Sequence, residues 1–256
     1  MNLKSACIVP DWRGLPPGVG ALSSTRRGGV SIGPYDDGAD GGGLNLGLHV
    51  GDEAAAVEQN RARLQAALPG APTWLNQVHG ARVVDAAAVD GVPDADASFT
   101  TRPGVVCAIM TADCLPVLFA DRAGSVVGAA HAGWRGLAQG VLQNTVMRMR
   151  EAGAGDITAW LGPAIGPEAF EVGAEVRAAF AYADPAAAAA FAARPGGKYL
   201  ADIYLLARLA LAGCGVSQVS GGSFCTVREA DRFYSYRRDR VSGRMASMVW
   251  IRPTAA

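Results

Sequence analysis

Three apolar runs between residues 105 and 130 constrain the fold of this chain more than any other feature. They are Val-Val-Cys-Ala-Ile-Met, Leu-Pro-Val-Leu-Phe-Ala and Ser-Val-Val-Gly-Ala-Ala, and turn residues separate them. Short runs rich in β-branched residues and bounded by turns predict strands, and the near absence of polar residues predicts burial. We therefore expect a sheet whose strands are buried.

The turn between the last two runs predicts a hairpin. Asp121-Arg122-Ala123-Gly124 has Asp at the first and Gly at the fourth position, as a type I turn prefers. If Asp121 faces Gly124, the register places Cys114 directly opposite His131, and a bulge at Gly124 shifts this by one residue. Opposed side chains on one face have Cβ atoms about 5 Å apart. This distance suits two ligands of one metal ion.

Periodicity and turn signals predict the remaining elements. We expect a solvent-facing amphipathic helix capped by Asp52 and running to about Leu68, and a mobile stretch over 36–43, which has too little apolar content to order itself. Further expected elements are a helix from the Gly133 turn through Met149 with Gly153 beyond its end, a strand at Ile157–Leu161, helix or loose surface at 178–193, a helix at Asp202–Ala212 and a closing strand at Met245–Ile251.

Strands and helices alternate without a regular βαβ spacing. The chain contains neither GxGxxG nor GxxxxGK[ST], so a doubly wound nucleotide-binding sheet is not favoured. We expect a mixed α/β fold. No repeat or linker divides the chain, and residues 1–256 are therefore treated as one domain.

Charge and cysteine usage exclude several classes of protein. Lys plus Arg and Asp plus Glu both number 23, so no overall field draws the protein to nucleic acid or to a membrane surface. The N-terminus lacks a long apolar segment, which predicts a cytoplasmic protein. Five cysteines without a CxxC pair argue against a disulfide framework and favour reduced thiols.

Three residues beside glycine turns form a candidate metal site. His79, Cys114 and His131 each lie at a predicted strand end, and the chain has only three histidines in all. Two imidazoles and a thiolate match catalytic zinc sites, which keep a fourth position for water or substrate. So few histidines allow one mononuclear site, whereas coupled copper centres need more imidazoles. Asp113 and Gln77 are candidates for orienting a histidine or a water, although Asp113 could equally cap a turn.

The same atoms permit a reaction without metal. Cys114 could act as a thiolate nucleophile with His131 or His79 as its base, as in a cysteine hydrolase or transferase. Such a dyad leaves one histidine without a role, whereas a zinc site uses both. Phosphate would be the obvious ligand of the arginines, although a solvated charged face is the expected role of any single member of the C-terminal cluster. These arginines are Arg26, Arg61, Arg135 and the cluster Arg232, Arg237, Arg238, Arg240 and Arg244 near the C-terminus.

Several motifs together resemble the YfiH-like family, whose members were first called multicopper polyphenol oxidases or laccase-domain proteins. The resemblance covers nearly the whole chain. It rests on Thr25-Arg26, Leu44-Asn45-Leu46-Gly47, His49-Val50-Gly51-Asp52, Gln77-Val78-His79-Gly80, Thr111-Ala112-Asp113-Cys114, His131-Ala132-Gly133-Trp134-Arg135-Gly136, Leu161-Gly162-Pro163-Ala164-Ile165-Gly166-Pro167 and Ser242-Gly243-Arg244.

The resemblance implies a zinc-dependent purine nucleoside phosphorylase that acts on adenosine, inosine and methylthioadenosine and also deaminates adenosine. It implies zinc held by His79, Cys114 and His131, and an α-β-β-α layered sandwich akin to cysteine-hydrolase-like toxin domains. The partners would be a nucleoside and phosphate, bound by a monomer. Some relatives are instead described as editing factors that remove misincorporated serine from a peptidoglycan precursor, which would suit the Cys114 nucleophile.

The implied chemistry assigns roles to further residues. In deamination, zinc would lower the pKa of a water that attacks the purine carbon bearing the amine, with Asp113 as the proton shuttle. In phosphorolysis, phosphate must lie beneath the ribose while the leaving purine is polarised. By resemblance, Arg26, Asn45 and Arg61 are expected substrate contacts, together with Gln77.

Overall fold

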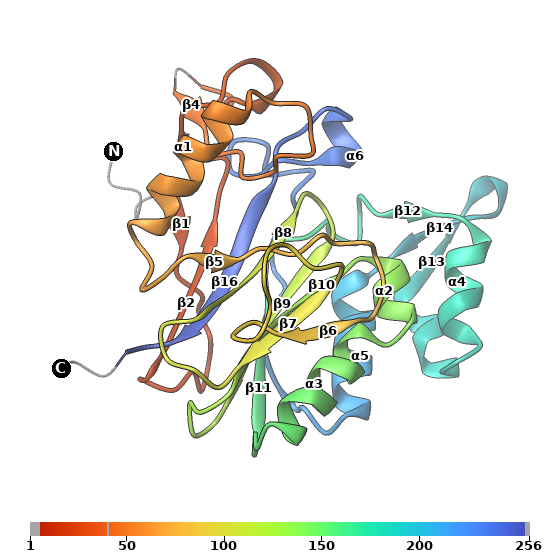
Figure 1. Cartoon of the computed structure of the whole chain (residues 1–256). Helices are drawn as coiled ribbons and strands as arrows, with labels where there is room; N and C mark the ends of the chain where they lie inside the picture. The colour runs from red at the N-terminus through yellow and green to blue at the C-terminus, as the bar shows by residue number, and fades with distance from the viewer. Residues whose placement is uncertain (1–5, 40, 254–256) are drawn as a thin grey trace.

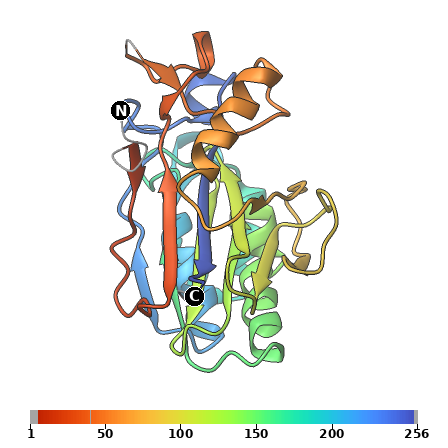
Figure 2. The same ribbon diagram turned by 60° about the vertical axis from the view of Figure 1, so that its left-hand side comes forward.

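A five-stranded sheet forms one half of the protein. The computed structural model describes residues 6–39 and 41–253. The strand order is β1 (Cys7–Ile8), β2 (Val19–Ser24), β16 (Met245–Ile251), β8 (Val106–Thr111) and β5 (Pro72–Thr73). Met245–Ile251 is a strand with the predicted bounds, and it lies in the middle of this sheet beside β2 (Figure 2).

A six-stranded sheet forms the other half. Its order is β15 (Gln218–Gly221), β11 (Ile157–Leu161), β9 (Leu115–Asp121), β10 (Val127–Ala132), β7 (Ala97–Thr100) and β6 (Val83–Asp85). Strands β8 and β9 are adjacent in the chain but belong to different sheets. The short turn from Thr111 to Cys114 therefore crosses from one sheet to the other.

Smaller strands and the helices complete the structure. The strands β3 (Arg27–Gly29) and β4 (Gly42–Gly43) form a pair, and β12 (Glu171–Val172), β14 (Lys198–Ala201) and β13 (Phe191–Arg194) form a third sheet. The helices are α1 (Ala54–Gln65), α2 (Trp134–Ala138), α3 (Val141–Glu151), α4 (Ala174–Ala181), α5 (Ile203–Gly213) and α6 (Tyr236–Asp239), with 3-10 turns at Gly33–Tyr35, Pro185–Ala190 and Pro195–Gly197. No described helix is long and apolar enough to span a bilayer.

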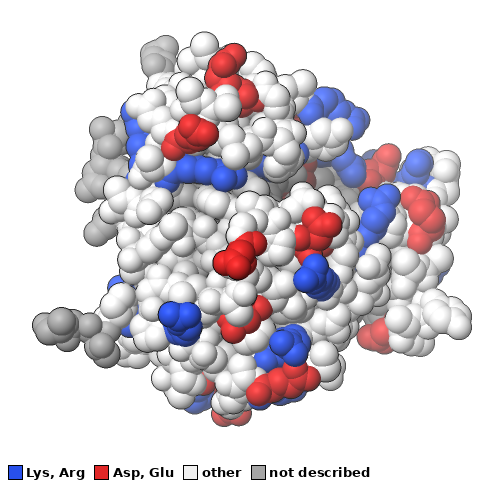
Figure 3. All heavy atoms as spheres, in the orientation of Figure 1, with Lys and Arg blue, Asp and Glu red and all other residues white. Residues whose placement is uncertain are grey.

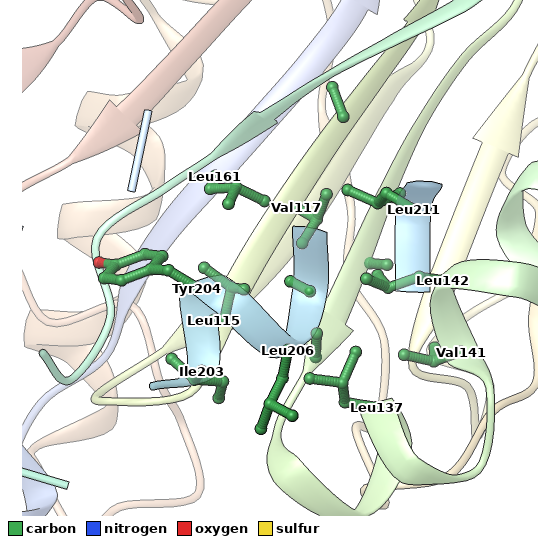
Figure 4. Close-up of a cluster of buried hydrophobic side chains, with 14 of the residues drawn as sticks. Leu115, Val117, Leu137, Val141, Leu142, Leu161, Ile203, Tyr204, Leu206 and Leu211 are labelled. Atoms are coloured by element: carbon green, nitrogen blue, oxygen red, sulfur yellow. The ribbon is translucent and has the colours of Figure 1, made fainter. Parts of the chain in front are cut away.

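The two large sheets face each other, and helices cover their outer faces (Figure 1). One apolar cluster lies between the sheets and includes Ile109, Leu118, Trp160 and Val249. A second cluster joins the outer face of the six-stranded sheet to α3 and α5, with side chains such as Leu115, Val117, Leu142 and Leu206 (Figure 4). In a third, Leu64 of α1 packs on the five-stranded sheet. The expectation of a mixed α/β fold is confirmed.

Alternation along β9 and β10 decides which side chains point between the sheets. Leu115, Val117 and Phe119 belong to the cluster on the helix side, and Leu118 belongs to the cluster between the sheets. Because successive residues of a strand point to opposite faces, Cys114 shares the inter-sheet face with Leu118. His131 shares that face with Ala129 by the same rule.

Helix α1 is shorter than predicted and its expected cap is wrong. It begins after Glu53 and has no side-chain cap. The carboxylate of Asp52 instead accepts hydrogen bonds from Ser31 Oγ at 2.6 Å and Asn45 Nδ2 at 2.9 Å. A distant loop therefore uses the side chain that local sequence assigned to the helix. Val57 and Leu64 are fully buried, so the amphipathic pattern itself is confirmed.

The predicted helix through Met149 is two helices. Gly140 has φ 88°, a left-handed conformation that ends α2 and starts α3 in a new direction. The strand at Ile157–Leu161 has its predicted bounds, and Asp202 caps α5 by accepting the N–H of Leu205. Residues 178–193 contain the end of α4, the 3-10 turn Pro185–Ala190 and most of β13.

Hydrogen bonds hold the described part of the stretch over 36–43, which we expected to be mobile. Gly42–Gly43 forms β4 and pairs with β3. The buried carboxylate of Asp37 accepts the N–H groups of Ala39 and Gly41. Side-chain to backbone bonds of this kind order a turn without apolar burial. Asp40 lies outside the described residues.

Candidate active site

A cavity of about 460 Å³ opens where the two large sheets meet at the 111–114 turn. Its lining comes from six separate parts of the chain, which the two-sheet arrangement brings together. The lining residues are His49, Leu75, Asn76, Gln77, His79, Met110, Thr111, Ala112, Cys114, His131, Tyr236 and Arg244. Pockets of this size suit a small ligand of nucleoside dimensions.

His79, Cys114 and His131 converge on the cavity, as predicted. Their ligand atoms all lie within 4.8 Å of one another, and Cys114 Sγ is 3.9 Å from His79 Nε2. Tetrahedral zinc with ordinary Zn–S and Zn–N bonds would hold such atoms about 3.3–3.6 Å apart. A small inward movement therefore suffices, and the donor set fits one metal ion. His131 is buried and His79 is exposed, which leaves one side of the site open to the cavity.

The predicted hairpin register is wrong by two residues. His131 faces Pro116, and Asp121 faces Val126 instead of Gly124. The carboxylate of Asp121 accepts the N–H groups of Ser125 and Val126, which lengthens the turn. A shift of two residues keeps each side chain on its face of the sheet, so Cys114 and His131 still project to the same side.

Glycine at position 133 makes room for the three donors. His131 pairs with Pro116 and Ala132 pairs with Leu115. Continued by one residue, this register places Gly133 opposite Cys114. A Cβ atom on Gly133 would lie 3.0 Å from Cys114 Sγ and 3.0 Å from His79 Cδ2. The absence of a side chain there is a steric requirement of the site.

The carboxylate of Asp96 orders two of the three donors, and little in the sequence indicates this role. Its Oδ1 lies 2.8 Å from His131 Nδ1, and it accepts the backbone N–H groups of Val78, His79 and Gly80. The prediction that His79 lies at a strand end is wrong. His79 has φ 61° and lies in a loop that these hydrogen bonds support. With Nδ1 bonded to Asp96, Nε2 of His131 is left to face Cys114. The only local sign is a charged residue between Ala95 and Ala97 in a buried segment.

Cys114 and His131 shift each other's pKa in opposite directions. Burial raises the pKa of the Cys114 thiol, but the positive charge of His131 and hydrogen bonds from both histidines outweigh it and lower the pKa to about 6. Burial lowers the pKa of His131, but the Cys114 thiolate and Asp96 raise it to about 9. Thiolate and imidazolium therefore stabilise each other at neutral pH.

Asp113 and Gln77 bind backbone or distant groups instead of the histidines. The carboxylate of Asp113 accepts Thr226 Oγ1 and Arg237 N–H, both at 2.6 Å, and so ties the 111–114 turn to α6. Gln77 lines the cavity while its amide exchanges two 2.8 Å hydrogen bonds with the backbone of Met110. Among the described residues, Asp113 makes no hydrogen bond to either histidine of the site.

Three expected substrate contacts lie outside the cavity lining described. Arg26 is buried, and it donates to the carbonyl oxygens of Asp36 and Ala230. Asn45 accepts the N–H of Arg244. Arg61 donates a hydrogen bond to the carbonyl oxygen of Leu46, and its guanidinium lies over the ring of Trp74 at 4.3 Å. The pKa of His49, which lines the cavity, is lowered first by burial, then by the charge of Arg244, and least by the charge of Arg61.

His49, Tyr236 and Arg244 line the cavity. The sequence assigned no role to His49 or Tyr236, and it named Arg244 only as one of several arginines that could bind phosphate. The only signal for His49 was its place in the motif His49-Val50-Gly51-Asp52, which contributes to the family resemblance. Arg244 belongs to a run of arginines that charge alone could not separate. The fold places it at the start of β16, beside the end of β8.

Comparison with known proteins places the chain in a family. Residues 20–252 match the family model described as multi-copper polyphenol oxidoreductase laccase. The chain is 56% identical over 253 residues to the Escherichia coli protein named purine nucleoside phosphorylase YfiH, covering 96% of this chain and 99% of that one. It is 53% identical to a Pseudomonas aeruginosa protein also named a purine nucleoside phosphorylase, with 96% and 99% covered.

Solved structures agree. The crystal structure of a Neisseria meningitidis protein has a TM-score of 0.89 and 52% identity, covering 97% of this chain and 100% of that chain. YlmD from Geobacillus stearothermophilus has a TM-score of 0.83 and 34% identity, with 93% of each chain covered. Sequence, fold and the order of motifs thus lead to one conclusion: the chain belongs to the YfiH-like, laccase-domain family.

Proposed function

We propose that this protein is a metal-dependent purine nucleoside phosphorylase whose reaction takes place in the cavity beside His79, Cys114 and His131. The observation that carries the proposal is the convergence of these three donors on an open cavity, in a chain 56% identical to a protein named purine nucleoside phosphorylase. The proposed substrates are inosine, adenosine and methylthioadenosine, with deamination of adenosine as a second activity.

Zinc is the proposed metal, held by His79 Nε2, Cys114 Sγ and His131 Nε2. When bound, it would supply a Lewis acid next to the reacting purine or phosphate oxygen. The donor set supports zinc because one thiolate and two imidazoles are its usual ligands at catalytic sites. The chain has three histidines, too few for the coupled copper centre that the family description suggests.

The protein's own residues position the reactants. Asp96 fixes His131 through its Nδ1, so that Nε2 keeps one direction throughout the reaction. Gln77 and Met110 form a rigid part of the lining because each satisfies the other's polar groups. In this proposal Asp113 is a positioning residue that holds α6, and with it Tyr236, against the cavity.

Incubation of the purified protein with inosine tests the proposal. Hypoxanthine released only when phosphate is present would support phosphorolysis, and release independent of phosphate would contradict it. Cys114→Ala should abolish the reaction, whereas Cys214→Ala, which removes a thiol outside the cavity lining, should not. Removal of metal by a chelator and restoration by zinc should stop and restart product formation.

A second candidate function rests on the pairing of Cys114 with His131. The imidazole of His131 lies between the thiol and the Asp96 carboxylate, the order found in cysteine hydrolases, and the pKa of Cys114 is lowered to about 6 after the opposing effect of burial. This arrangement would suit an amide-cleaving enzyme that removes serine from a peptidoglycan precursor. The expected likeness to cysteine-hydrolase-like toxin domains stays a prediction. Cleavage of a seryl muramyl precursor that survives chelation would favour this candidate.

We further propose that residues 1–256 act as one cytoplasmic, monomeric domain on small molecules. Figure 3 shows basic and acidic side chains interspersed over the face it presents, which suits neither nucleic acid nor an anionic membrane. All five cysteines are described and none is paired. Thiols in this state are expected in a reducing compartment.

A further inference from the structure

The cavity has a second wall, which contains a guanidinium and is separate from the metal donors. We define this basic wall as His49 and Arg244, which both line the cavity. His49 is exposed, and Arg244 is partly buried. The positive charges of Arg244 and Arg61 follow burial as causes of the lowered pKa of His49, so two guanidinium groups lie close to this imidazole.

Arg244 is held rigidly, but not by a carboxylate. Its Nη1 donates to the carbonyl oxygens of Ser242 at 2.8 Å and Gly243 at 3.0 Å, and its backbone N–H donates to Asn45 Oδ1 at 2.8 Å. A Cβ atom on Gly47 would lie 2.8 Å from Arg244 Cγ, so the bare backbone at Gly47 provides the space for its aliphatic chain. The guanidinium is therefore fixed before any ligand arrives.

Two other arginines of the same C-terminal region, Arg232 and Arg238, differ from Arg244. Arg232 pairs with Glu229 at 2.5 Å and Arg238 pairs with Asp239 at 2.7 Å. Within residues 6–39 and 41–253, Arg244 takes part in no ion pair, and its Nε and Nη2 have no hydrogen-bond partner. A partly buried guanidinium without a carboxylate is costly unless an anion completes it.

We propose that Arg244, assisted by His49, is the oxyanion subsite of this cavity and binds inorganic phosphate. The free Nε and Nη2 edge of a guanidinium matches two oxygens of a tetrahedral phosphate. Arg244 and the three metal donors line the same cavity. Phosphate bound there would lie between the two walls. The role of the bound phosphate as a reactant rests on the proposed phosphorolysis. Its binding rests only on the charge and hydrogen-bonding groups of Arg244.

Direct binding of inorganic phosphate to the zinc-loaded protein tests the subsite. We expect Arg244→Gln to weaken phosphate binding roughly 10- to 100-fold, measured by calorimetry, because it removes two hydrogen bonds donated by a charged guanidinium. Arg102→Gln is the matched control, because Arg102 is exposed at the opposite end of β8 and does not line the cavity. Equal phosphate affinity in wild type and Arg244→Gln, or none in wild type, would overturn the proposal.

Kinetics separate this proposal from the proposed function. The KM for phosphate should rise at least about tenfold in Arg244→Gln, with a smaller change in the KM for inosine. Arg244-dependent phosphate binding without phosphorolysis would refute the proposed function and leave the subsite standing. Phosphorolysis with an unchanged KM for phosphate would refute the subsite alone. If Arg244→Gln does not fold, Arg244→Lys, which keeps the charge but loses the fork, and His49→Gln should show the same selective rise.

Discussion

The two walls of the cavity fix their polar side chains in different ways. On the wall formed by His79, Cys114 and His131, the buried carboxylate of Asp96 binds one imidazole and the backbone beside the other. On the basic wall, carbonyl oxygens and the amide of Asn45 hold Arg244, and the described residues supply no carboxylate partner.

The difference is what the two proposals require, because the proposed metal is a cation and the proposed phosphate is an anion. A carboxylate behind His131 keeps its tautomer fixed and strengthens it as a ligand. A carboxylate beside Arg244 would neutralise the charge that an incoming anion needs. Neutral acceptors position that guanidinium and leave its charge available. Substitutions that act on one wall and spare the other test this division.

The largest effect is expected for Cys114→Ala, which removes a donor from the metal wall. Zinc content should fall close to zero and turnover should fall by more than roughly 100-fold, because two imidazoles alone hold the ion poorly. Metal analysis and the inosine assay measure both. A variant that keeps its full zinc content and loses only activity would show that Cys114 acts as a nucleophile and is not a metal donor.

A smaller effect on the same wall is expected for Asp96→Asn. The amide keeps the size of the side chain but weakens its hold on His131, so zinc affinity should fall roughly 10- to 100-fold. Competition with a chelating dye measures this. Asp94→Asn, two residues away and exposed, is the control and should bind zinc as wild type does. Equal zinc affinity in Asp96→Asn and Asp94→Asn would show that Asp96 does not support metal binding through His131.

Arg26→Ala should change stability and not substrate binding. Its guanidinium is buried and bonded to the carbonyl oxygens of Asp36 and Ala230, outside both walls. Loss of these bonds should lower the free energy of unfolding by about 2 kcal/mol. Urea denaturation measures this, and the KM for inosine should stay at the wild-type value. A raised KM in a stable variant would restore Arg26 as the substrate contact that the family resemblance implied.

The smallest effect concerns protons released on zinc binding. At pH 7.5 Cys114, with its pKa of about 6, is already a thiolate, whereas His131, with its pKa of about 9, carries a proton that zinc must displace. His131 should therefore contribute about one proton per zinc, and Cys114 should add a second as the pH falls through 6. Calorimetry in buffers of different ionisation enthalpy counts them. A release that does not increase toward lower pH would contradict the thiolate–imidazolium pair.

Much of the local structure followed from the sequence. Ile157–Leu161 and Met245–Ile251 are strands with the predicted bounds, and Asp202 caps α5 as an acidic residue before an apolar helix should. These features depend on periodicity and on side chains near in sequence. The triad was also found in advance, because histidine is rare in this chain and all three donors adjoin turns.

Long-range contacts decided the remainder. The bonds from Asp121 to Ser125 and Val126 lengthened the hairpin turn, and the register moved by two residues. Asn45 accepts the backbone N–H of Arg244, 199 residues away, and its expected contact with substrate stays a prediction.

By itself, the sequence determined several strands, the family and which three residues converge as candidate metal donors. Only the tertiary structure decided that Asp96 orders the donors and that Arg244 faces them without a carboxylate partner among the described residues. The physical reason is that a side chain's chemistry is local, whereas its burial and partners depend on how distant segments pack. A carboxylate or guanidinium has the same composition in a solvated loop as in a site, and only the fold distinguishes the two.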